Sequence, residues 1–142
     1  RMETGYLHWG HDISPEENQY QAGLQFAISY KKNVDFIGKE SLLKIKDKKD
    51  NKKFVMLVLN NSNPGEPLLL HDEPIYNSDR IIGRTTSGNF SFNFNTNLAF
   101  GYINSELSKQ DLAKEELYIE VEKKKYPASI IIKPLNDKNI KN

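Results

Sequence analysis

The chain has 142 residues, 37% hydrophobic and 27% charged, a composition typical of one soluble globular domain. Its 20 basic and 19 acidic side chains nearly cancel, so the sequence predicts no long-range positive field and no nucleic-acid partner. The absence of Cys excludes disulfides, zinc–thiolate sites and thiol nucleophiles, and no apolar run approaches the ~20 residues of a membrane span. We therefore expect a cytoplasmic location and no membrane contact.

The first thirty residues carry two local structural signals. The opening residues, Arg1 to Tyr6, have neither an initiating Met nor the pattern of a signal peptide, so we expect them to follow directly on a longer chain. The segment Ser14-Pro15-Glu16-Glu17 has a capping-box pattern that predicts the start of a short helix. Residues Leu24–Tyr30 alternate apolar with small or polar side chains, which predicts a strand.

A second helix is predicted over Lys39–Lys49. Apolar side chains lie among charges there, Glu40 stands four residues before Lys44, and lysines crowd the C-terminal end, where they favour the helix dipole. Together, residues 1–50 read as a helix, a strand and a helix that precede a separate unit.

Beyond Asn51 the sequence changes to short β-type runs separated by turn-rich stretches such as Asn60–Gly65. The runs are Phe54–Leu59, Leu68–Leu70, Pro74–Tyr76, Arg80–Thr86, Leu98–Ile103, Leu117–Glu122 and Tyr126–Ile132. Six or seven short strands predict a mainly β fold with minor α content, an antiparallel barrel or sandwich over residues 51–135. The last two runs look like a closing hairpin, and we expect the polar tail 136–142 to be disordered.

Few side-chain patterns point to chemistry. His8 and His11, with Asp12 beside them, could offer ligands to a metal, but polar packing is the better reading because no third dedicated ligand is apparent, and we assign no metal site. Ser87 has no recognisable base, so we assign no catalytic residue. Tyr6 and Trp9 supply flat amphipathic surfaces that suit either stacking on a planar heterocycle or ordinary packing.

Two further stretches have competing interpretations. Thr86-Ser87-Gly88 is expected to end a strand, where Gly permits a positive φ, and its hydroxyls either bind a ligand or only support a turn. Phe90, Phe92 and Phe94 recur at every second position, so in a strand all three would share a face used for core or interdomain packing.

Several of these stretches together resemble the C-terminal part of the glycine-cleavage T-protein (aminomethyltransferase) family. Arg1–Asp12 is similar to the family segment R-x-E-x-G-x-x-x-[YW]-G-x-[ED], and Trp9 is typical of its dimethylglycine and sarcosine dehydrogenase branch. The other matching stretches are Gln21–Leu24, Asp35–Leu43, Pro74–Tyr76, Ile82–Gly88, Leu98–Ile103, Tyr126–Ala128 and Lys133–Leu135. They follow the family's order over nearly the whole chain.

The resemblance implies an aminomethyltransferase C-terminal barrel at residues 51–135, with residues 1–50 forming the end of the preceding folate-binding domain plus a connecting helix. It implies tetrahydrofolate as the cofactor, a small methylamine substrate, upstream folate-binding domains as partners, and FAD only in an upstream domain. Tyr6 and Trp9 are implied aromatic contacts to the folate. The resemblance also implies that Arg1 pairs with a negative charge, such as that of the folate glutamate tail. Glu3 lies in the same cofactor-binding segment.

The leading hypothesis is therefore a domain that helps to close the folate site of a one-carbon-transferring enzyme, with the family's catalytic groups in upstream segments. Alone, the chain is expected to be inactive. The rival hypothesis is a non-catalytic barrel that serves as a binding or interaction module without folate.

Overall fold

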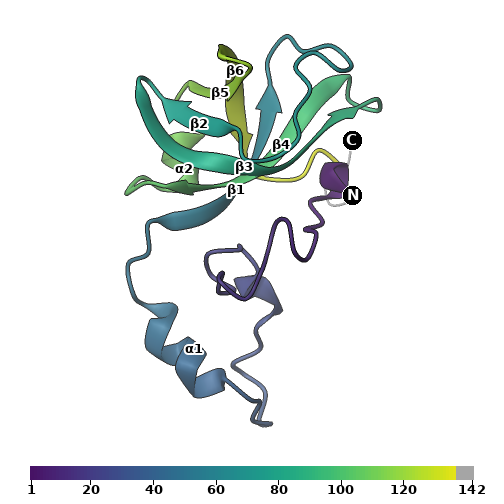
Figure 1. The fold of residues 1–142 in the computed structure, drawn as a ribbon. Coiled ribbons are helices and arrows are strands. Elements are labelled where there is room, and N and C mark those ends of the chain that lie inside the picture. The colour runs from purple at the N-terminus through teal and green to yellow at the C-terminus, as the bar shows by residue number, and fades with distance from the viewer. Residues whose placement is uncertain (137–142) are drawn as a thin grey trace.

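The computed structural model of the chain describes residues 1–136. A six-stranded antiparallel barrel forms one end, and an irregular N-terminal segment with a helical arm lies below it (Figure 1). Among the described residues, no helix has the length and apolar character needed to cross a bilayer.

The barrel consists of β1 (Lys52–Leu59), β2 (Pro74–Asn77), β3 (Arg80–Ser91), β4 (Thr96–Asn104), β5 (Leu117–Val121) and β6 (Lys124–Ile131). The strands follow the order β1-β4-β3-β2-β5-β6, and pairing of β6 with β1 closes the sheet. Closure removes the exposed edges that an open sheet would present. The predicted mainly β fold and antiparallel barrel are confirmed.

The barrel interior is filled by aliphatic side chains that alternate along the strands. Leu57, Ile75, Leu117 and Ile119 are each 0% exposed, so the apolar face of each strand points inward. A second cluster of Phe54, Phe100 and Tyr102 is buried outside this aliphatic core, and Met2 and Leu7 of the N-terminal segment pack against it. The second cluster thus joins the N-terminal segment to the barrel.

The β3 strand is longer than predicted and contains an irregularity that shapes the site. Pairing with β4 shifts register between Thr85 and Ser87, a bulge that leaves Thr86 as the extra residue. The strand does not end at Gly88, whose φ is not positive. A Cβ on Gly88 would lie 2.2 Å from the Cβ of Leu69, so Gly is needed there for close packing.

The Leu68–Leu70 run was predicted as a strand, and that prediction is wrong. Leu69 is buried while Leu68 and Leu70 are each 62% exposed, so the alternation is present without strand pairing. The amide of Leu70 donates to the carboxylate of Glu73 at 2.7 Å. This backbone donor is therefore used within the loop and does not bond to a neighbouring strand.

Helix α1 (Lys39–Lys46) confirms the helix predicted there, although it ends three residues before Lys49. The helix expected at Ser14 does not form. The capping contacts do form, since the Ser14 amide donates to Glu17 Oε2 at 3.0 Å. Asn18 Oδ1 then accepts from the amides of Tyr20 and Gln21, and this local bonding replaces the helical pattern with successive turns.

The strand predicted at Leu24–Tyr30 is also absent. A 3₁₀ turn, η2 (Gln25–Ala27), occupies the segment, and Phe26 is 83% exposed. Within residues 1–136 no strand pairs with this stretch, so its alternating pattern has no ladder to join. A short helix that we did not predict, α2 (Lys109–Leu112), is capped by Ser108, whose Oγ accepts from the Asp111 amide at 3.1 Å.

The Phe90, Phe92 and Phe94 repeat does not share one face of a strand. The β3 strand ends at Ser91, and Phe92 and Phe94 lie in the connection to β4, where Phe92 is 80% exposed. Phe90 packs edge-on against Phe92 with ring centroids 5.1 Å apart. The pattern therefore marks a hairpin tip and contributes nothing to the barrel core.

Candidate functional site

A polar cleft of about 560 Å³ lies between the N-terminal segment and the bulged part of β3. Its lining includes Arg1, Glu3, His8, His11, Leu69, His71, Thr86, Ser87, Gly88, Phe90 and Ser91. The cleft thus brings together residues from the start of the chain, the loop before β2 and the β3 strand. All three histidines of the chain line it.

A buried ion pair holds the N-terminal wall of this cleft. Arg1 Nη1 donates to Asp12 Oδ2 at 2.8 Å, and the Asp12 side chain is 0% exposed. Thr86 Oγ1 donates to Asp12 Oδ1 at 2.6 Å, and Arg1 Nη2 donates to Ser87 Oγ at 2.8 Å. The β3 bulge therefore presents two successive hydroxyls to the two partners of one ion pair.

Tyr102 ties the same network to β4. Its hydroxyl donates to the backbone oxygen of Asp12 at 2.8 Å. Burial raises the pKa of Tyr102, and the nearby carboxylates of Glu17 and Asp12 raise it further, so the phenol remains a donor at neutral pH. Each buried side-chain nitrogen or oxygen in residues 1–136 has a hydrogen-bond partner, so this polar interior is satisfied.

Glu3 secures the opposite end of the wall. Its carboxylate accepts from the hydroxyl of Ser91 and from Asn93 Nδ2, the latter at 2.8 Å, while its backbone oxygen accepts from the Asn136 amide at 2.8 Å. The hydrogen bonds from Ser91 and Asn93 lower the pKa of Glu3. Glu3 thereby joins the N-terminus, the β3–β4 hairpin tip and the segment after β6.

The predicted aromatic residues lie close by but do not line the cleft itself. Tyr6 is 65% exposed and Trp9 is 66% exposed, and both belong to the loop between Arg1 and Asp12. His8 and His11 of the same loop stack on each other, with ring centroids 4.6 Å apart. The structure thus groups Arg1 and Glu3 on the cleft wall and leaves Tyr6 and Trp9 open to solvent beside it.

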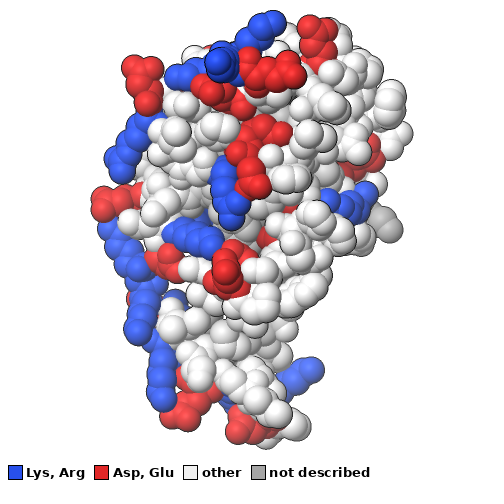
Figure 2. All heavy atoms as spheres, viewed as in Figure 1, with Lys and Arg blue, Asp and Glu red and all other residues white. Residues whose placement is uncertain are grey.

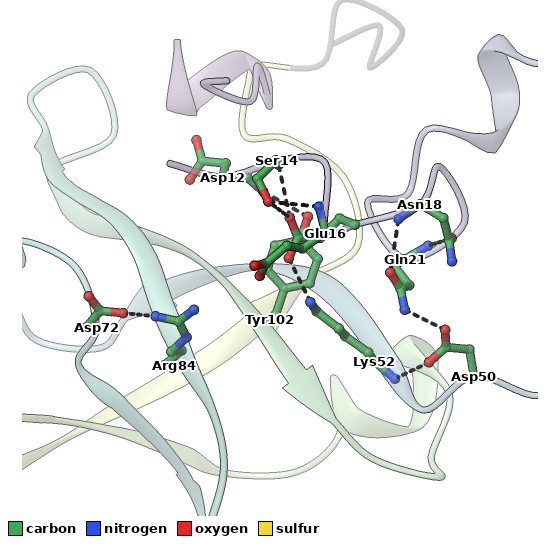
Figure 3. Close-up of polar contacts among 11 residues, drawn as sticks. Asp12, Ser14, Glu16, Asn18, Gln21, Asp50, Lys52, Asp72, Arg84 and Tyr102 are labelled. Atoms are coloured by element: carbon green, nitrogen blue, oxygen red, sulfur yellow. Dashed lines mark hydrogen bonds and ion pairs between the residues drawn. The ribbon is translucent and has the colours of Figure 1, made fainter. Parts of the chain in front are cut away.

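A second, smaller cleft of about 340 Å³ adjoins the first, because His11, His71 and Thr86 line both. Figure 3 shows Arg84 facing Asp72, with Lys52, Glu16 and Ser14 nearby. Lys52 Nζ donates to Glu17 Oε1 at 2.7 Å, and Arg84 pairs with Asp72. Glu16 also lines this cleft, so its charged lining consists of the carboxylates of Glu16, Glu17 and Asp72 and the cations of Lys52 and Arg84.

Glu17 gives this region a testable pH dependence. Burial alone would raise the pKa of Glu17, but the hydrogen bonds from Lys52 and Ser14 outweigh burial and lower it below the ordinary value of 4.5. A lowered pKa in the folded state means that the ionised carboxylate stabilises the fold above pH 4.5, and that this stabilisation is lost as the pH falls through the folded-state pKa.

The variant Glu17→Gln should therefore unfold more easily than the unchanged chain at pH 7, by about 1 kcal/mol, and the difference should be smaller at pH 3 than at pH 7. Urea unfolding at both pH values measures it. Glu16→Gln is the matched control, since the Glu16 side chain is exposed next to Glu17. A difference between Glu17→Gln and the unchanged chain that did not shrink between pH 7 and pH 3 would contradict the assignment.

The structure also bears on the remaining sequence hypotheses. Asp12 was considered only as a metal ligand, yet it is committed to Arg1 and Thr86. In residues 1–136 no three His, Asp or Glu side chains are grouped closely enough to hold a metal ion. The sequence did contain a signal for the Arg1–Asp12 pair, because residues of opposite charge stand at the two ends of the family-like segment Arg1–Asp12. Leu69 and Ser91 gave no such signal, because only the folded barrel brings them to the cleft.

Charges over the rest of the visible surface are mixed. Figure 2 shows Lys and Arg interspersed with Asp and Glu, with basic side chains most frequent along the edge beside α1. This distribution agrees with the near-zero net charge of the sequence.

The fold and site define a small antiparallel barrel domain with a polar cleft between the barrel and an N-terminal segment. The model of the family "Glycine cleavage T-protein C-terminal barrel domain" matches residues 52–137, and the chain belongs to this family. The resemblance seen in the sequence is thereby confirmed.

Similar proteins include two enzymes and one solved structure. Dimethylglycine dehydrogenase of Rattus norvegicus is 33% identical over 135 residues, which are 95% of this chain and 15% of that protein. Aminomethyltransferase of Listeria welshimeri is 34% identical over 134 residues, 94% of this chain and 35% of that enzyme. The crystal structure of aminomethyltransferase T from Bartonella henselae matches with a TM-score of 0.78 at 24% identity, over 95% of this chain and 36% of that one. The chain therefore spans about a third or less of these relatives.

Proposed function

We propose that this chain is the C-terminal portion of an enzyme that transfers a one-carbon unit to tetrahydrofolate, and that its barrel helps to close the folate site. One observation carries the proposal: a polar cleft lies against the β3 bulge, beside a loop that exposes two aromatic rings. The family membership and the two enzymes it resembles support the class of reaction. Residues 1–50 would then be the end of a preceding folate-binding domain plus a connecting helix.

The residues present fit the chemistry of tetrahydrofolate. Its pterin is a planar heterocycle with hydrogen-bonding edges, and the exposed rings of Tyr6 and Trp9 offer flat surfaces for such a ring. Arg1 and Glu3 line the cleft beside these rings, which supports their assignment to the cofactor-binding segment. Asp12 already neutralises Arg1, so we do not propose that Arg1 pairs with the glutamate tail.

When bound, tetrahydrofolate supplies the nitrogen that accepts the one-carbon unit. This chain would contribute binding and the exclusion of water, while the catalytic groups and a small methylamine substrate would belong to upstream domains. A flavin, where one is used, would belong to a further upstream domain. A cytoplasmic location fits the Cys-free composition.

Titration calorimetry with tetrahydrofolate tests the proposal. The full-length protein encoded by the reading frame that contains this chain should bind, and the 142-residue chain alone should show neither turnover nor tight binding. In the full-length protein, Trp9→Ala should weaken binding roughly tenfold through loss of stacking. Tyr118→Ala, on β5 and outside both clefts, is the control and should leave the affinity unchanged.

Two outcomes would count against this function. Absence of tetrahydrofolate binding by the full-length protein would favour the rival reading, a barrel module without folate. Aminomethyl transfer by the isolated chain would show that the reacting groups lie within it.

A further inference from the structure

The loop that exposes Tyr6 and Trp9 is closed by one charged pair. Arg1 Nη1 donates both to the Tyr6 backbone oxygen at 2.9 Å and to Asp12 Oδ2 at 2.8 Å. Within the loop, the His8 amide donates to the same Asp12 Oδ2 at 2.8 Å. Arg1 and Asp12, the two ends of the loop, are therefore joined to each other, and each also bonds to a backbone group within the loop.

The charged pair is in turn attached to the barrel at the β3 bulge. Thr86 donates to the Asp12 oxygen that Arg1 does not use, and Ser87 accepts from the second Arg1 nitrogen. A regular strand would direct neighbouring side chains to opposite faces, whereas the bulge re-aims Thr86. The bulge thus has a specific consequence, which is that consecutive hydroxyls reach the same ion pair.

The position of Asp12 excludes direct contact with a ligand. Its side chain is 0% exposed, and its two oxygens accept from Arg1, His8 and Thr86. A buried carboxylate with these partners can influence a ligand only by holding other groups in place. The groups it holds are the wall residue Arg1 and the loop that carries Trp9.

We propose that Asp12 is a positioning residue that, together with Arg1, fixes the Trp9 loop at the rim of the cleft. The identity of the ligand rests on the proposed function, but the fixing of the loop does not. The ordered loop presents its aromatic rings without a further loss of chain entropy on binding. Without the Asp12 carboxylate, Arg1 would lose its buried partner, and the His8 amide and the Thr86 hydroxyl would lose their acceptor.

The composition of the chain provides a direct probe of this loop. Trp9 is the only Trp and is 66% exposed, so tryptophan fluorescence of the 142-residue chain reports on this position alone. The variant Asp12→Asn keeps the shape of the side chain and removes its charge. We expect it to lower the fluorescence anisotropy of Trp9 and to raise the rate of acrylamide quenching. In the full-length protein it should weaken tetrahydrofolate binding roughly tenfold.

Two comparisons separate positioning from general loss of stability. Asp79→Asn makes the same chemical change in an ion-paired aspartate outside both clefts. It should alter neither the fluorescence of Trp9 nor the binding of tetrahydrofolate. Thr86→Val removes one hydrogen bond to Asp12 and should give a smaller shift in the same direction, while Thr86→Ser, which keeps the hydroxyl, should restore the behaviour of the unchanged chain. If Asp12→Asn fails to fold, the two Thr86 variants decide the question.

Unchanged Trp9 anisotropy and quenching in a folded Asp12→Asn or Thr86→Val variant would overturn the proposal. A loosened Trp9 loop with full tetrahydrofolate affinity would also overturn the claim that the loop is positioned for a ligand. If the unchanged full-length protein binds no tetrahydrofolate, the proposed function fails, and the Trp9 readout of the isolated chain still decides whether Asp12 fixes the loop.

Discussion

Replacing Phe100 with alanine should lower the free energy of unfolding by about 3–5 kcal/mol, the range for deleting a large buried aromatic ring. Phe100 is 1% exposed and packs edge-on against Phe54, with ring centroids 5.2 Å apart. The guanidinium of Arg1 also lies 5.8 Å from the centre of its ring. The substitution would therefore leave a cavity and remove the surface on which the N-terminal segment packs. Urea unfolding followed by circular dichroism measures the change.

Phe92→Ala is the matched control for this prediction. Phe92 is the same residue type in the connection between β3 and β4, but it is 80% exposed. Its replacement should change stability by no more than about 0.5 kcal/mol. Equal effects of the two substitutions would mean that the second aromatic cluster does not pack as described.

Gly83→Ala should be about as damaging, for a steric reason. Gly83 lies in β3 between its two neighbouring strands, and a Cβ there would lie 2.1 Å from the backbone oxygen of Tyr102 and 2.8 Å from the Cα of Ile103. Backbone atoms cannot move aside as a flexible side chain can, so β3 and β4 would have to separate. We expect a loss of about 3 kcal/mol or more, measured as a lower thermal midpoint and unfolding free energy.

Gly65→Ala provides the contrast. Gly65 has a φ of +73°, and a methyl group added there would meet no atom within 4 Å, so the substitution strains only the left-handed backbone. That strain costs about 1–2 kcal/mol. A larger effect at Gly65 than at Gly83 would contradict the close approach of β3 and β4.

The strands were predictable because each buries one face and so carries an alternating pattern. The β5–β6 hairpin is the clearest example: Leu117 and Ile119 are buried on one face, and Glu122 and Lys123 adopt the positive φ of a tight turn. Helix α1 was predictable from its charge pattern. The strand assigned to residues 24–30 failed because alternation is only half of the requirement, since a strand also needs a neighbour to pair with.

The site was less predictable than the fold. The sequence singled out Arg1, Glu3, Tyr6 and Trp9 through resemblance, and whether these residues contact a ligand remains a prediction. Sequence reasoning missed the role of Asp12, because burial beside Arg1 depends on packing against β3 and β4. It also missed the β3 bulge at Thr86, since one extra residue in a strand leaves no composition signal. The role of Asp12 depends on contacts between segments more than seventy positions apart, such as Thr86 with Asp12.

The claim that the barrel helps to close the folate site can be tested by photoaffinity labelling. The full-length protein is labelled with a light-activated tetrahydrofolate analogue, and the labelled peptides are then mapped. We expect labelling within residues 6–12 or 86–91, the loop and strand beside the cleft, and we expect excess tetrahydrofolate to suppress this labelling. Labelling confined to upstream segments, or labelling of these residues that excess tetrahydrofolate does not reduce, would show that the barrel does not close the folate site.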